Sequence, residues 1–155
     1  MEISKLDQKI KPSGTMAISN KSRELKSQGK PVIGFGAGEP DFPSPDYVVD
    51  AAIKAAADPK NHKYSPAAGL ESLREVIAKT TKEYSGFEIN ADNIIVSNGG
   101  KQSILTAFLS TLDTGDEVII PAPYWTTYPE AVKIAGGTPV FIETEKSNNF
   151  KVTVD

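Results

Sequence analysis

Two adjacent glycines followed by a lysine carry the clearest chemical signal in the sequence. Residues 97–102 (SNGGKQ) lie between a β-branched apolar run and a predicted helix. At Gly99 and Gly100 the backbone can approach a ligand closely, and the first turn of a helix has unpaired N–H groups and a partial positive charge. These properties predict an anion site best suited to phosphate. A bound anion would offset the unfavourable interaction of Lys101 with the helix dipole. A tight turn with a solvated lysine is the alternative.

The single tryptophan gives a second signal. Trp125 follows the apolar run 118–120 and two prolines. The carboxyl ends of neighbouring parallel strands face one crevice, so Trp125 is expected near the turn at Gly99 and Gly100. There its indole could stack on a flat heteroaromatic ring. A tryptophan that packs in the core or on the surface at a helix start is the alternative.

Two loops add weaker signals. Residues 36–42 (GAGEPDF) expose backbone amides at Gly36 and Gly38 that could bind a carboxylate, although composition alone indicates only a rigid loop. The hydroxyl of Tyr64 could reach an anion, and a tyrosine packed on the surface is the alternative. His62 is the only histidine, and no neighbouring residue suggests a catalytic triad or a metal site.

The elements that must position these residues form an α/β pattern. The sequence predicts helices over about 15–28, 45–57, 70–84, 101–112 and 127–135, and strands over 31–35, 94–96, 118–120 and 139–142. Ser44 is the expected N-cap of the second helix, with Pro45 at its first position. From residue 94 onward, strands alternate with helices, as in parallel βαβ units. A hairpin arm is expected over 150–154, and the three parallel strands would leave an open sheet edge, so we expect the chain to stop inside a domain.

Composition restricts the class of protein. The chain has 155 residues, 39% of them hydrophobic and 24% charged, which is typical of a globular protein with a real core. Its net charge of −3 argues against nucleic-acid binding. The absence of cysteine excludes disulfides, thiol chemistry and cysteine-based zinc sites, and fits a cytoplasmic location. No apolar run approaches the ~18 residues of a membrane span, and the charged N-terminus is not a secretory signal.

Taken together, six blocks of the sequence resemble the class I pyridoxal-phosphate (PLP) aminotransferases, in the aspartate/prephenate aminotransferase branch. The blocks are IKPSGTMAISNKSREL, GAGEPDF, HKYSPAAGLESLRE, NIIVSNGGKQSI, GDEVIIPAPYWTTYPE and AGGTPVFIET. The resemblance implies a fold-type I PLP-dependent transferase with a mostly parallel sheet. It assigns residues 1–43 to an N-terminal arm and small-domain segment, and 44–155 to the N-terminal part of the large PLP-binding domain. It also implies a homodimer with its active site at the subunit interface.

The same resemblance implies which residues hold the cofactor, pyridoxal 5′-phosphate. The backbone of Gly99, Gly100 and Lys101 would bind its phosphate. Trp125 would stack on its pyridine ring and touch the substrate. Tyr64 would cross the dimer interface to the phosphate bound by the partner subunit.

The substrate contacts that the resemblance implies are fewer. The N–H of Gly38 would meet the α-carboxylate, Lys101 would face the side-chain carboxylate of an acidic substrate, and Thr15 would line the substrate side chain. The implied reaction moves an amino group between aspartate or glutamate and a 2-oxo acid. A PLP-dependent C–S lyase on the same fold and a non-catalytic module that binds a phosphate-bearing ligand are the alternatives.

The family's Schiff-base lysine cannot be placed in this sequence. In the resembling enzymes that lysine lies far downstream, and none of the lysines here stands in the expected S-K-[TS] context. Without it the reaction lacks its covalent anchor and general base. We therefore expect no catalytic residue within these 155 residues, and no turnover by this chain alone.

Overall fold

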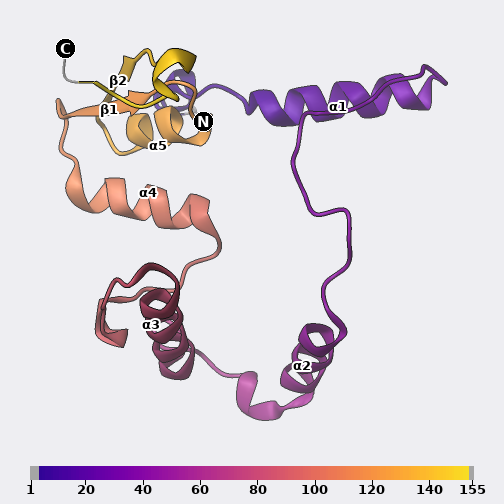
Figure 1. The fold of residues 1–155 in the computed structure, drawn as a ribbon, viewed down its shortest axis with the longest axis vertical. Coiled ribbons are helices and arrows are strands. Elements are labelled where there is room, and N and C mark those ends of the chain that lie inside the picture. The colour runs from indigo at the N-terminus through magenta and orange to yellow at the C-terminus, as the bar shows by residue number, and fades with distance from the viewer. Residues whose placement is uncertain (1–3, 154–155) are drawn as a thin grey trace. The chain divides into compact units, whose positions relative to one another are not determined.

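The computed structural model describes residues 4–153, which form five α-helices, two strands and four short 3₁₀ helices (Figure 1). The α-helices are α1 (Gly14–Ser27), α2 (Asp46–Ala57), α3 (Glu71–Ser85), α4 (Gly100–Thr111) and α5 (Thr127–Ile134); the strands are β1 (Glu117–Pro121) and β2 (Thr138–Ile142). The 3₁₀ helices are η1 (Asp7–Lys9), η2 (Pro59–Asn61), η3 (Ala91–Asn93) and η4 (Lys146–Asn148). No helix of this described part is long and apolar enough to cross a membrane.

The chain divides into two compact units. One comprises the described residues up to Gly38 together with those from Gly99 onward, and the other is Glu39–Asn98. In the first unit, β1 and β2 pair in parallel from Glu117↔Thr138 to Pro121↔Ile142, with α5 as the crossover between them. This is the βαβ unit that the sequence predicts.

The core of the first unit lies between this sheet and α5. Ile120 of β1 and Val132 of α5 are 5% and 0% exposed, and α4 packs against α5. Gly137 allows the turn into β2 to pass close to these side chains, because a Cβ there would lie 3.1 Å from Val132 Cγ1. The sheet and the start of α4 are therefore joined through α5.

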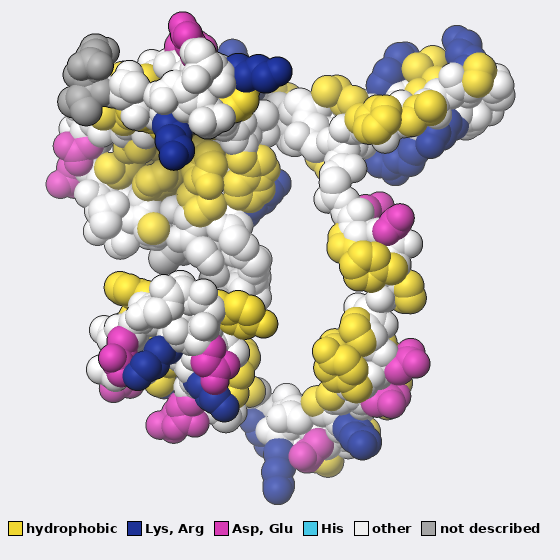
Figure 2. Space-filling view, viewed as in Figure 1, with side chains coloured by type: hydrophobic (Ala, Val, Ile, Leu, Met, Phe, Trp, Pro, Cys, Tyr) yellow, Lys and Arg dark blue, Asp and Glu magenta, His cyan; other side chains and the backbone are white. Residues whose placement is uncertain are grey.

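In the second unit, α3 packs against the segment that leads to residue 98. Arg74 donates from Nη1 to the Ala91 carbonyl at 2.9 Å, and Ile94 is buried. The Val96 N–H donates to the Ala68 carbonyl at 2.9 Å, beside Gly69, where a Cβ would come within 2.8 Å of Val96 Cβ. Like α3, α2 contains no fully buried residue, and its exposed apolar side chains are visible in Figure 2.

The five helices and the strands at 118–120 and 139–142 are confirmed within one or two residues. The predicted strands at 31–35 and 94–96 are wrong: neither segment is assigned as a strand. A strand needs a neighbouring ladder, but Val96 pairs with a loop carbonyl and Ile95 is 71% exposed. Residues 34–36 instead lie against α1, where a Cβ on Gly36 would be 2.9 Å from Ile18 Cγ2.

Two smaller expectations also change. The N-cap of α2 is Pro45 rather than Ser44, and no side chain caps this helix. Proline fixes its own φ in the range an N-cap adopts, so the helix starts one residue later. In place of a hairpin arm after residue 142, η4 turns the chain, and Phe150 has a left-handed φ of 56°, which extended strands do not have. Residue 154 lies outside the described residues.

Candidate functional site

The N-terminus of α4 lacks the groups that neutralise the other helix starts. Its N-cap is Gly99, which supplies no side chain, and its first turn contains no acidic residue. In contrast, α2, α3 and α5 each have an acidic residue in the first turn, and Ser13 Oγ caps α1 by accepting from the Met16 N–H at 3.4 Å. The partial positive charge of α4 is therefore not balanced by its own first turn.

The backbone at this helix start is shaped for close approach. Gly99 has φ 85° and ψ 167°, and the first intrahelical bonds run from the N–H groups of Gln102 and Ser103 to its carbonyl at 3.1 and 3.3 Å. The amides of Gly100 and Lys101 precede these bonds in the first turn. A Cβ at Gly99 or Gly100 would meet no other atom within 4 Å. The space on the Cβ side of both glycines is thus open, and a phosphate group fits the donor chemistry of these amides.

Lys101 and Trp125 lie together, although they come from different elements. Lys101 Nζ is 5.6 Å from the centre of the Trp125 ring, and Tyr128 contacts the indole edge-on at a centroid distance of 5.8 Å. A cation over an exposed indole contributes about 0.5–1 kcal/mol. Trp125 thus lies within reach of the Lys101 side chain, and its nearness to the backbone of Gly99 and Gly100 stays a prediction. Its 43% exposure leaves ring surface available to a ligand, and stacking on one stays a prediction.

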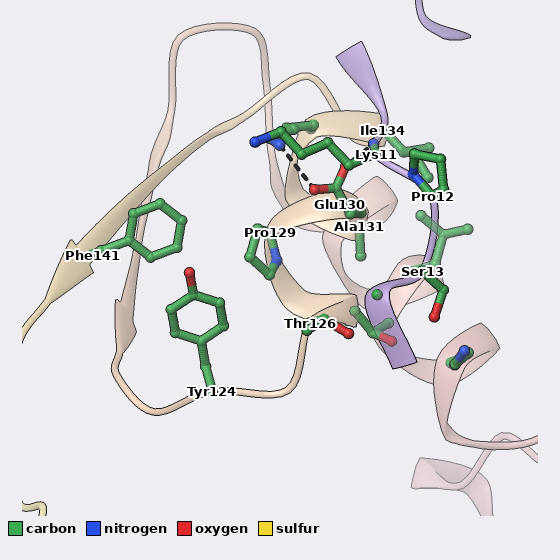
Figure 3. A pocket seen from close by; sticks show the side chains of 15 residues that line it. Lys11, Pro12, Ser13, Tyr124, Thr126, Pro129, Glu130, Ala131, Ile134 and Phe141 are labelled. Carbon is green, nitrogen blue, oxygen red and sulfur yellow. Dashed lines mark hydrogen bonds and ion pairs between the residues drawn. The ribbon is translucent and has the colours of Figure 1, made fainter. Parts of the chain in front are cut away.

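A cavity of about 650 Å³ lies beside Lys101, within the first unit (Figure 3). It is bounded by the N-terminal arm, α4, α5 and β2; the lining residues are Lys11, Pro12, Ser13, Gly14, Lys101, Leu105, Tyr124, Thr126, Thr127, Pro129, Glu130, Ala131, Lys133, Ile134 and Phe141. Tyr124 and Phe141 stack along one side with ring centroids 5.0 Å apart. Lys101 and the two stacked rings are thus among the side chains that line the cavity.

Glu130 is the acidic residue in the cavity wall. Its Oε2 accepts a 3.0 Å hydrogen bond from the Lys11 backbone N–H, and its Oε1 accepts from Lys133 Nζ at 2.9 Å (Figure 3). Burial alone would raise the pKa of this carboxyl, but the hydrogen bonds from Lys11 and Lys133 and their positive charges outweigh it, so the pKa lies below its usual value. Glu130 is therefore held as a carboxylate.

Thr15, Gly38 and Tyr64 are not among the residues that line this cavity. Thr15 is half-buried in the first turn of α1, and Gly38 is exposed, with open space around its Cα. Tyr64 belongs to the other unit and is fully exposed, next to His62, whose Nε2 lies 2.9 Å from the Ala56 carbonyl. Among residues 4–153, no three histidine, cysteine, aspartate or glutamate side chains gather as metal ligands.

Sequence reasoning missed four residues that shape the cavity: Glu130, Lys133, Tyr124 and Phe141. The spacing of Glu130 and Lys133, one turn apart on a helix, was a usable signal for their ion pair. No pattern links Glu130 to Lys11, because the two residues are 119 positions apart.

The sequence is similar to those of known aminotransferases. A family model described as aminotransferase class I and II matches residues 30–155. The aspartate aminotransferase of Streptomyces avermitilis is 53% identical over 146 residues, which cover 94% of this chain and 36% of that protein. The aspartate/prephenate aminotransferase of Nitrosomonas europaea is 47% identical over 155 residues, or 100% of this chain and 39% of that protein.

A solved structure gives the same picture. The aspartate aminotransferase of Thermus thermophilus, solved with maleate, matches with a TM-score of 0.93 and 41% identity, over 99% of this chain and 40% of that one. The shared fold is that of the fold-type I domain, with the short parallel sheet described above. The chain spans 36% and 39% of the lengths of the two curated relatives just named.

Proposed function

We propose, from the premise that this chain belongs to the aminotransferase class I and II family, that the intact gene product moves an amino group between an acidic amino acid and a 2-oxo acid. The observation that carries the proposal is the start of α4. It has no side-chain cap, open space at Gly99 and Gly100, and the Lys101 ammonium over the Trp125 indole. This arrangement suits a phosphate-bearing, flat aromatic ligand and an acidic substrate beside it.

The family depends on PLP, and the residues present fit that cofactor. The amides of Gly99, Gly100 and Lys101 would donate to its phosphate, the face of Trp125 would lie on its ring, and Tyr64 would reach the phosphate bound by the partner subunit. When bound, PLP supplies an electron sink for the pair released at the substrate α-carbon. The protein would hold this group in one orientation, and the positive end of α4 would stabilise the negative charge of its phosphate.

The substrate is held at both ends in this proposal. The N–H of Gly38 donates to the α-carboxylate, and the Lys101 ammonium pairs with the side-chain carboxylate. Thr15 and the first turn of α1 border the substrate side chain. Charge pairing with Lys101 favours four- and five-carbon dicarboxylic amino acids over alanine, because alanine has no side-chain carboxylate to pair with the ammonium.

The proposal extends to assembly and location. A homodimer gives Tyr64, which is fully exposed here, a partner surface to contact. A cysteine-free chain suits the cytoplasm, where disulfides do not form. The division into a small-domain segment over 1–43 and a large-domain segment over 44–155 also remains a proposal.

The test is a transamination assay on the purified intact gene product. With added PLP, aspartate and 2-oxoglutarate should give oxaloacetate and glutamate, and prephenate is tried as a second acceptor. Lys101→Met should raise the KM for aspartate at least about tenfold while leaving the KM for alanine within about twofold, because only aspartate loses a charged contact. Lys79→Met, which changes an exposed lysine of the other unit, is the control.

Three outcomes would overturn the proposal. Release of pyruvate from cystathionine without transamination would assign the C–S lyase alternative. PLP binding without turnover of either kind would assign a binding module. PLP binding is measured by the change in cofactor absorbance and by the quenching of Trp125 fluorescence, taken as the difference between the wild type and Trp125→Phe. If neither signal changes when PLP is added, the proposed cofactor site is refuted.

A further inference from the structure

An acidic side chain of α5 is hydrogen-bonded to the N-terminal arm. Glu130 accepts the Lys11 N–H through Oε2 at 3.0 Å and the Lys133 ammonium through Oε1 at 2.9 Å. The side chains of Glu130 and Lys133 are 22% and 26% exposed, so the pair is partly shielded from water. A carboxylate that accepts a backbone N–H makes a stronger bond than a neutral acceptor does.

The arm beyond this contact has few ways to move independently. Lys11 is followed by Pro12, whose φ is fixed, and then by Ser13, the N-cap of α1. The Ser13 carbonyl accepts the Ala17 N–H at 3.0 Å, and its hydroxyl accepts the Met16 N–H at 3.4 Å. The anchored Lys11 amide therefore lies two residues before the N-cap of α1.

The same short segment forms a wall of the cavity. Residues 11–14 line it together with Lys101 and Glu130 itself. The opening available beside Lys101 therefore depends on where the arm is held.

We propose that Glu130 is a positioning residue: its carboxylate fastens the Lys11 amide to α5 and so sets the width of the cavity between the arm and Lys101. The anchoring follows from the contacts above. A loosely held arm would weaken the fit of the cavity around the side chain of an acidic substrate. This effect on the substrate rests on the proposed function. Glu130 itself contacts no substrate and moves no proton in this account.

The first test is amide hydrogen exchange at Lys11 in the intact gene product. Glu130→Ala should speed exchange at Lys11 about tenfold, the ratio expected when a charge-assisted hydrogen bond of this partly exposed kind is lost. Glu130→Gln keeps the shape and one acceptor oxygen, so its acceleration should be smaller. Glu88→Ala removes a carboxylate that pairs with Lys82 at 2.7 Å in the other unit, and should leave Lys11 unchanged.

The second test separates positioning from general damage. Glu130→Ala should raise the KM for aspartate several-fold, with kcat and the KM for alanine within about twofold, because uniform binding of the side chain is lost. Glu130→Gln should show a smaller rise in the same direction. If Glu130→Ala fails to fold by circular dichroism, Glu130→Gln alone decides both tests.

Several results would overturn the inference. Exchange at Lys11 that equals the wild-type rate in a folded Glu130 variant would show that the carboxylate does not hold the arm. Faster exchange with an unchanged KM for aspartate would show that the arm does not set the cavity. If the wild-type protein has no transaminase activity, the proposed function is refuted instead. The exchange rate at Lys11 still tests whether Glu130 holds the arm.

Discussion

Replacing Gly99 with alanine should destabilise the protein through backbone conformation alone. Gly99 has φ 85° and ψ 167°, a region occupied almost only by glycine. A Cβ at this position meets no atom within 4 Å, so no clash adds to the cost. Holding a non-glycine residue there costs on the order of 1–3 kcal/mol, and we expect the free energy of unfolding of Gly99→Ala to fall by that amount.

Neighbouring glycines provide matched controls for this prediction. Gly100 has no positive φ and equally open space, so Gly100→Ala should leave stability unchanged or raise it by up to about 1 kcal/mol. Gly86 has φ 71° and ψ 0°, a left-handed conformation that asparagine tolerates. Gly86→Asn should therefore cost less than Gly86→Ala, whereas Gly99→Asn should cost as much as Gly99→Ala.

Urea unfolding of the cofactor-free intact gene product measures these differences. If Gly99→Ala and Gly100→Ala unfold at the same urea concentration, the backbone at the start of α4 is not strained and the reasoning is refuted. Rescue by Gly99→Asn would refute the assigned conformation in particular. PLP affinity measured on the same variants then reports whether this backbone also binds the phosphate, with Gly99→Ala expected to bind more weakly.

Three further predictions use other sites. At Gly69, φ is 97° and an added Cβ would lie only 2.8 Å from Val96 Cβ, so the urea midpoint of Gly69→Ala should fall further than that of Gly86→Ala; an equal fall would contradict the close packing. Because the pKa of Glu130 is lowered, its stabilising effect is complete above the usual glutamate pKa of about 4.3 and is lost as pH falls through the lower folded value. The difference in melting temperature between the wild type and Glu130→Gln should therefore shrink in acid, and a constant difference would argue against the charge effect. Lys101→Met should alter the emission of Trp125, whose ring lies 5.6 Å from the ammonium, with Trp125→Phe as the blank; an identical difference spectrum would place the lysine elsewhere.

Helix positions could be predicted from the sequence because their signals are local. The apolar stripe of α3 and its stop at Gly86, or the glycine turn before α4, lie within a few residues of the elements they define. The parallel pairing of β1 with β2 was also predictable, since a short helix connects two apolar runs.

Strand formation at other runs could not be predicted in the same way. Residues 94–96 have the β-branched composition of a strand, but a strand is defined by a partner that local sequence does not specify. The contact between Glu130 and Lys11 in the cavity wall could not be predicted from local sequence either, because it depends on how the N-terminal arm folds back. The glycine turn and Trp125 were identifiable because the chemistry of single residues marks them.

The close packing of two glycines onto α1 links two of the proposed substrate contacts, Gly38 and Thr15. A Cβ on Gly34 would lie 2.8 Å from Ser22 Oγ, and one on Gly36 would lie 2.9 Å from Ile18 Cγ2, so any larger residue would lift this segment off the helix. Gly38 follows two residues later, while Thr15 stands in the first turn of the same helix. A tilt of α1 would therefore move Gly38 and Thr15 together, so that the contact with the α-carboxylate and the wall beside the substrate side chain would shift in one motion.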